Sequence, residues 1–136
     1  QIQKNVSHLT LGNVSSSRDF TFVTDTVEAF LKAAAYKNAS GEIINVGYGD
    51  DIKIGDLADK LIKISKKKIK IKTDESRFRP YDVQRLICDN KKAKNVLKWE
   101  PKVSIDKGLK LTYDWAMKNK VQFNAPFKRF YYKNSK

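Results

Sequence analysis

The sequence contains little sulfur, little histidine and no long apolar run. Among its 136 residues there is one cysteine, Cys88, and one histidine, His8. Neither an internal disulfide nor a zinc site is therefore expected, and we predict no metal ligands. No apolar stretch approaches the ~20 residues of a membrane-spanning helix. The N-terminus also lacks the basic-then-apolar order of a secretion signal, so we expect a soluble protein of a reducing compartment, the cytoplasm.

Familiar catalytic and cofactor motifs are missing as well. The glycines at 47, 49 and 55 do not have the G-x-G-x-x-G spacing of a dinucleotide-binding loop, and there is no P-loop. Residues 132–136 formally match Tyr-x-x-x-Lys, but a frayed chain end does not hold a lysine beside a tyrosine as that chemistry requires. Cys88 has no activating base nearby in the sequence and is assigned to packing. We therefore predict no catalytic and no cofactor-binding residue in this chain.

Positive charge is abundant and concentrated in two segments. The chain has 28 basic and 15 acidic residues, a net charge of +13. Residues 60–72 contain seven lysines and no acid, and residues 118–136 contain six basic residues and no acid. A nucleic-acid-binding module is one interpretation. In the alternative interpretation, the alternating lysines of 68–72 form the solvent-exposed face of a strand, where they oppose aggregation. The basic aromatic tail 120–136 then docks on the domain or on a protein partner.

The hydrophobic pattern predicts an α/β fold in one domain. Strands are expected at residues 9–11, 20–23, 43–47 and 68–72, the third buried on both faces. Four helices are expected. The first begins at a capping box formed by Asp25 and Glu28, the second and third cover 57–64 and 90–97, and the fourth begins at a cap formed by Ser104. Alternating strands and helices favour crossover units. The chain begins at Gln1 and its only methionine is Met117, so we expect a processed protein or a piece of a longer one.

Four segments resemble the C-terminal part of extended short-chain dehydrogenase/reductase enzymes, the NAD-dependent epimerase/dehydratase family. Residues 18–25, Arg-Asp-Phe-Thr-Phe-Val-Thr-Asp, resemble that family's R-D-[FW]-x-[YF]-V-x-D. Residues 44–47, Ile-Asn-Val-Gly, are similar to its [YF]-N-[IV]-G, and residues 79–83, Arg-Pro-Tyr-Asp-Val, to its R-P-x-[ED]-V. Residues 89–115 are similar to D-x-x-K-A-x-x-x-L-G-W-x-P followed by G-L-x-x-T-x-x-W, with Lys98 where glycine is usual. Together they cover about residues 9–119.

The resemblance implies a substrate-binding role for four residues. Arg18 is expected to bind a phosphate of a nucleotide diphosphate, or else to pair with Asp19 or Asp25. Arg79 is expected to bind the diphosphate or ribose and Asp82 a ribose hydroxyl, or else these two form a surface ion pair. Asn45 is expected to contact substrate from the carboxyl end of a buried strand, or else to satisfy a loop. Asp25 and Trp99 are assigned to capping and packing.

The resemblance also implies what the whole enzyme does. Residues 1–119 are expected to be the substrate-binding lobe, and 120–136 a basic aromatic tail. The N-terminal dinucleotide-binding (Rossmann-type) half, with the catalytic Tyr-x-x-x-Lys, is expected to be missing. The whole enzyme is then an NAD- or NADP-dependent nucleotide-sugar 4,6-dehydratase or 4-epimerase, a homodimer that takes a nucleotide-diphosphate sugar. This chain alone is expected to bind no cofactor and to be inactive, and nucleic acid is the less favoured ligand.

Overall fold

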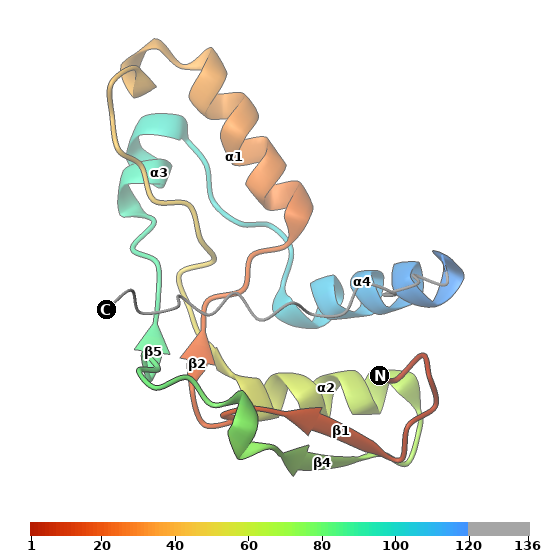
Figure 1. The fold of residues 1–136 in the computed structure, drawn as a ribbon. Helices are drawn as coiled ribbons and strands as arrows, with labels where there is room; N and C mark the ends of the chain where they lie inside the picture. The colour runs from red at the N-terminus through yellow and green to blue at the C-terminus, as the bar shows by residue number, and fades with distance from the viewer. Residues whose placement is uncertain (120–136) are drawn as a thin grey trace.

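The fold consists of two small sheets and four α-helices, and the structure, a computed structural model, describes residues 1–119 (Figure 1). The strands are β1 (His8–Leu11), β2 (Ser17–Arg18), β3 (Ile52–Lys53), β4 (Lys70–Thr73) and β5 (Arg85–Leu86). The α-helices are α1 (Val23–Ala35), α2 (Ile54–Ser65), α3 (Lys91–Leu97) and α4 (Ile105–Asn119). Two short 3-10 turns are η1 (Lys37–Ala39) and η2 (Glu75–Arg77). The tail 120–136 lies outside the described residues.

The two sheets contain parallel pairs joined by long connections. β1 and β4 form one parallel pair, with Leu9 opposite Ile71. In the second sheet, β2 lies between β3, to which it is antiparallel, and β5, to which it is parallel. Parallel strands need a crossover, and the crossover from β1 to β4 includes α2. The α/β class with crossover units, as predicted from the sequence, is confirmed.

The elements gather in two groups. Figure 1 shows α1 and α3 at one end, and α2, the β1–β4 pair and α4 at the other, with β2 and β5 between them. The core of the first group consists of side chains with at most 1% exposure: Ala29, Ala93, Leu97 and Trp99. The indole Nε1 of Trp99 donates a hydrogen bond of 2.9 Å to the buried carbonyl of Asp25. Trp99 is therefore a packing residue, as predicted.

Asp25 does not cap α1, which corrects the predicted capping box. The helix begins two residues earlier, at Val23, and its N-cap Phe22 makes no side-chain cap. Asp25 is instead buried inside the first turn, where its carboxylate accepts hydrogen bonds from the backbone N–H groups of Lys102 and Val103 at 3.1 and 2.9 Å. Glu28 pairs with Lys102 at 2.7 Å. A buried carboxylate must be satisfied, and the 102–103 turn satisfies this one.

Two predicted strands are not formed. Residues 20–22 connect β2 to α1 without strand pairing, and residues 43–47 are not a strand either. Ile43 is 86% exposed, although its apolar neighbourhood predicted burial on both faces. The pattern of side chains suits a central strand, but a strand also needs a neighbour to pair with, and residues 1–119 supply none here.

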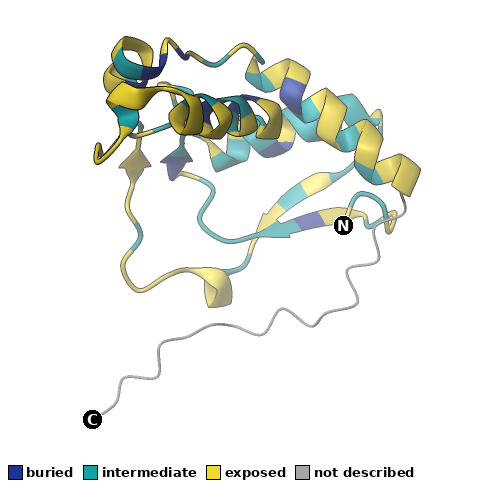
Figure 2. Cartoon of the chain, turned by 90° about the horizontal axis from the view of Figure 1, so that it is seen from above, coloured by how far each residue is buried: buried dark blue, intermediate teal, exposed yellow. Residues whose placement is uncertain are grey.

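One face of α1 is apolar and exposed. Its large apolar side chains point outward, with exposures of 63% for Val23, 49% for Val27, 66% for Phe30 and 67% for Leu31. Figure 2 shows the exposed residues on α1, and the buried residues of this helix are Asp25 and Ala29. Such a stripe is typical of a helix that packs on another layer.

Candidate functional site

A cavity of about 230 Å³ lies where the two parallel strands β1 and β4 end. Residues from the β1–β2 loop, from β2, from the start of α2 and from the segment after β4 line it: Asn13, Ser16, Arg18, Ile54, Arg77, Arg79 and Asp82. We call it the arginine pocket. The carboxyl ends of parallel strands are where open α/β sheets bind ligands. Three guanidinium groups against one carboxylate make this a pocket for an anion.

Arg18 is held at the rim by two acceptors. Its Nη2 donates to the Asp82 Oδ1 at 2.7 Å, and its Nη1 donates to the Ser17 carbonyl at 2.7 Å. The ion pair is largely shielded, with side-chain exposures of 22% for Arg18 and 17% for Asp82. Arg18 therefore pairs with Asp82, and neither of the partners considered from the sequence, Asp19 or Asp25, takes that role.

Asp82 uses both carboxylate oxygens. While Oδ1 accepts from Arg18, Oδ2 accepts from the Asn13 amide at 3.1 Å. Asn13 is fixed in turn, because its own Oδ1 accepts from the backbone N–H of Ser15 at 2.9 Å. The alternative pairing of Asp82 with Arg79 is not formed. One carboxylate thus connects the β1–β2 loop with the segment after β4 and orients the Arg18 fork.

Arg77 and Arg79 differ in how far they are engaged. Arg77 donates from Nε to Asp74 at 3.1 Å and from Nη1 to the Thr10 carbonyl at 3.0 Å. Hydrogen bonds from Ser76, with that of Arg77, hold the pKa of the Asp74 carboxyl below its ordinary value. Arg79 lines the pocket, is exposed, and makes no hydrogen bond or ion pair within residues 1–119. Arg79 is therefore the cation there whose donors are all available to a ligand.

Asn45, the fourth predicted site residue, does not line the arginine pocket. It is exposed and lies in the unpaired segment 43–47. Arg18, Arg79 and Asp82 are brought together, and Asn45 is not. The sequence did not single out Asn13 or Arg77. Arg77 stands two residues before Arg79 in a basic, polar connection, and this proximity to a predicted site residue could have identified it.

A second cavity, of about 420 Å³, borders the three-stranded sheet, and its charged centre was not predicted. There Asp51 accepts hydrogen bonds from the Ser17 hydroxyl and from Arg85, whose Nη2 lies 2.9 Å from Asp51 Oδ1. The bonds from Arg85, and then from Ser17, lower the pKa of Asp51, while Asp51 raises the pKa of Arg85. The arrangement joins β2, β5 and the segment before β3.

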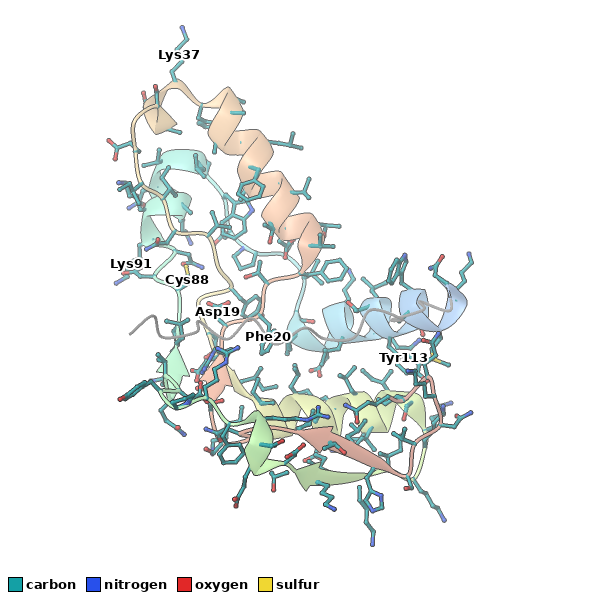
Figure 3. All side chains as sticks on the ribbon, in the orientation of Figure 1. Asp19, Phe20, Lys37, Cys88, Lys91 and Tyr113 are labelled. Atoms are coloured by element: carbon teal, nitrogen blue, oxygen red, sulfur yellow. The ribbon has the colours of Figure 1, made fainter. Side chains whose placement is uncertain are left out.

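Asp19 organises the backbone of two segments that are far apart in the sequence. Its carboxylate accepts from the N–H groups of Tyr48 and Gly49, each at 2.8 Å, and of Cys88 at 3.2 Å. Figure 3 labels Asp19 and Cys88 near one another, between the two groups of elements. Burial, and then the charges of Asp19 and Asp89, raise the pKa of the Cys88 thiol, so it stays protonated at neutral pH. Cys88 thus behaves as a packing residue.

The glycines after the 43–46 segment do not form a cradle for a dinucleotide. A Cβ on Gly47 would lie 2.2 Å from the Cβ of Cys88, and one on Gly49 would lie 2.9 Å from the Asn90 side chain. Both spaces that a pyrophosphate would need are thus filled by this chain's own side chains. Within residues 1–119, this glycine segment therefore does not fit the pyrophosphate of NAD or NADP. Across residues 1–119, no three His, Cys, Asp or Glu side chains gather in a way that could hold a metal ion.

Comparison with known proteins gives the family. The sequence model described as GDP-mannose 4,6 dehydratase matches residues 1–112. The chain belongs to this family of nucleotide-sugar dehydratases and epimerases, within the extended short-chain dehydrogenases/reductases. No helix in residues 1–119 has both the length and the apolar character needed to cross a membrane.

Individual relatives of this dehydratase-family chain are longer than it is. It is 36% identical over 109 residues to the UDP-glucuronate 4-epimerase of Thermodesulfobacterium geofontis, covering 79% of this chain and 32% of the relative. It is 33% identical over 113 residues to the dTDP-D-glucose 4,6-dehydratase of Mus musculus, and this match covers 79% of this chain and 31% of the relative. A solved UDP-glucuronic acid 4-epimerase from Bacillus cereus, in complex with UDP-glucuronic acid and NAD, matches with a TM-score of 0.76 and 31% identity, covering 88% of this chain and 38% of that one. The chain thus spans about a third of the relatives' length.

Proposed function

We propose that this chain is the nucleotide-sugar-binding portion of an NAD(P)-dependent nucleotide-sugar 4,6-dehydratase or 4-epimerase. The observation that carries the proposal is the meeting of Arg18, Arg79 and Asp82 in the arginine pocket. Guanidinium groups bind phosphate oxygens through paired donors, which suits a diphosphate. Asp82 has lone pairs beyond the two that Arg18 and Asn13 use, so it can also accept a ribose hydroxyl.

The chemistry of the whole enzyme is assigned to residues outside these 136. Gly47 and Gly49 leave no space for a pyrophosphate, and the residues that line the arginine pocket include no tyrosine–lysine pair. The proposed division is that this lobe binds and orients the nucleotide sugar, while a dinucleotide-binding half supplies NAD or NADP and the catalytic groups. We therefore expect residues 1–136 alone to be inactive, and turnover of a nucleotide sugar by the purified chain would contradict this.

The exposed apolar face supports such a missing half. Val27, Phe30 and Leu31 on α1 are exposed apolar side chains, and so is Ile43 in the segment whose sequence suits a central strand. Since about two thirds of each relative's length lies outside the matched segment, the proposed occupant of this face is their dinucleotide-binding half.

The docking can be tested by mixing. The separately produced remainder of the T. geofontis epimerase is added to residues 1–136, and association is followed by size-exclusion chromatography with turnover of UDP-glucuronate as a second readout. Leu31→Glu should abolish association, whereas the control Leu111→Glu, on α4 and 44% exposed, should not. Equal behaviour of the two variants, or self-association of the chain through this face, would contradict the proposal.

Binding by the arginine pocket is tested separately, by calorimetry with UDP and GDP. Arg79→Ala should weaken binding by about 1.5–3 kcal/mol, the scale of a hydrogen bond to a charged group. Arg79→Lys keeps the charge but loses the paired donors of the guanidinium. Its affinity should therefore lie between that of the unmodified chain and that of Arg79→Ala. Arg85→Ala is the matched control, because Arg85 lines only the second cavity. If Arg85→Ala weakens binding and Arg79→Ala does not, the second cavity is the site and the proposal fails.

A further inference from the structure

Two lysines of β4, Lys70 and Lys72, point to one face of the β1–β4 pair, and a third, Lys68, lies two residues before the strand begins. Lys68, Lys70 and Lys72 are exposed, while the intervening Ile69 and Ile71 are half-buried, as strand alternation requires. We call the three lysines the lysine face. β1 contributes no acid beside them, since Lys70 lies opposite His8 and Lys72 opposite Thr10.

The charge of the lysine face is not compensated locally. Seven other lysines of residues 1–119 each have a carboxylate oxygen within 3.8 Å: Lys32, Lys60, Lys91, Lys92, Lys94, Lys102 and Lys110. Within the same residues, Lys68, Lys70 and Lys72 have no such partner. The nearest acid along the chain, Asp74, is already engaged by Arg77. Nine further lysines of residues 1–119 also have no such partner, so the lysine face differs from them by its arrangement: three lysines at alternate positions with no acid between them.

The lysine face leads to the arginine pocket. β4 ends at Thr73, and the next basic residues along the chain are Arg77 and Arg79, which line that pocket. An extended chain from residue 68 to residue 72 covers about 13 Å, and the Debye length is about 10 Å at 0.1 M salt. The potential of these lysines therefore overlaps with that of the pocket's arginines at moderate ionic strength.

We propose that the lysine face guides anionic ligands of the nucleoside-diphosphate class toward the arginine pocket by long-range attraction. The inference rests on the proposed function and adds a kinetic role to it. No lysine of the face lines either cavity, and the face carries no arginine fork to hold a phosphate. Uncompensated charge outside a site acts on the rate of encounter, and contacts inside the site act on the rate of release.

The test is stopped-flow binding of mant-GDP and mant-UDP to residues 1–136. In the double variant Lys70→Glu/Lys72→Glu, we expect the association rate constant to fall about 3- to 10-fold at low salt. The dissociation rate constant should stay unchanged, and the difference should vanish near 0.5 M salt as screening removes the field. The control Lys37→Glu/Lys91→Glu makes the same change of net charge on residues that Figure 3 places away from β4, and it should have a much smaller effect. Circular dichroism confirms that both variants fold.

Each other result has a definite meaning. Equal losses in the two double variants would show that only net charge matters and would overturn the inference, as would an effect confined to dissociation. If neither nucleotide binds the unmodified chain, the proposed function fails together with the inference. If binding persists and the association rate is unchanged, only the inference fails. Tighter binding of a 20-nucleotide DNA strand than of either nucleotide, lost in Lys70→Glu/Lys72→Glu, would reassign the lysine face to nucleic acid.

Discussion

Arg18 and Asp82 lie 64 residues apart in the sequence and form a 2.7 Å ion pair at the rim of the arginine pocket. The motifs at residues 18–25 and 79–83, which resemble two separate segments of one enzyme family, are thus joined by a charge-assisted hydrogen bond. Because Arg18 also donates to the Ser17 carbonyl, the plane of its guanidinium is fixed before any ligand arrives. A fork held in this way loses less freedom when it binds phosphate than a free side chain does.

Asp82→Ala separates the two roles of this carboxylate. If Asp82 accepts from a ribose hydroxyl, its loss should weaken UDP and GDP binding by about 1.5–3 kcal/mol. The same change removes a negative charge beside the phosphates, so pyrophosphate, which has no ribose, should bind at least as tightly as before. Calorimetry with the three ligands on one protein preparation measures both effects. Tighter binding of all three would show that Asp82 makes no contact with the ribose.

Three of the four residues singled out from the sequence line one cavity, whereas their hydrogen-bond partners were not predicted. The resemblance of their motifs to those of the family implies phosphate- or ribose-binding roles for Arg18, Arg79 and Asp82, and the structure places these three residues around one cavity. Which acid pairs with Arg18 depends on how the segment after β4 folds against the β1–β2 loop, and no local pattern encodes that contact. Asn13 and Asp51 escaped notice for the same reason, since their roles arise from neighbours 69 and 34 residues away.

Local patterns predicted helices more successfully than strands. The helices α1 to α4 all occur, because an amphipathic stripe and a helix end are properties of one segment. The strand expected at 43–47 does not form, since strand pairing depends on a neighbour that residues 1–119 do not supply. The helix boundaries also moved: α1 begins at Val23, and the polar residue expected to cap it, Asp25, satisfies the 102–103 turn instead.

Gly47 should tolerate no side chain. The Cβ of Gly47→Ala would lie 2.2 Å from the Cβ of Cys88 and 3.1 Å from Asp19 Oδ2, so the backbone must shift. We expect a loss of about 1–3 kcal/mol in the free energy of unfolding, measured by urea denaturation. Cys88→Gly removes the opposing Cβ, so the double variant should be more stable than the sum of the single effects predicts. Strict additivity would show that the two positions do not conflict.

Stability should depend on pH through Asp51. Arg85, and then Ser17, lower the pKa of this carboxyl in the folded state. Its contribution is therefore fully present above the unfolded pKa and is lost as the pH falls through the lower, folded value. Asp51→Asn cannot titrate, so the stability gap between it and the unmodified chain should be largest near pH 7 and shrink below about pH 4. Urea denaturation across this range measures the gap, and a gap that stays constant with pH would contradict the assignment.

Lys98 is the residue at which the sequence departs from its family's usual glycine, and the departure has a cost. It ends α3 in the left-handed conformation, with φ at 49°, a region that side chains other than glycine occupy with strain. Its carbonyl accepts a 2.6 Å hydrogen bond from Lys32, a contact that does not depend on the side chain at 98. Lys98→Gly should therefore raise the free energy of unfolding by about 0.5–1 kcal/mol, with an increase in Tm. Lys94→Gly, inside the same helix, is the matched control and should be destabilising by about 1 kcal/mol. If both glycines destabilise alike, the left-handed turn at 98 carries no strain for lysine.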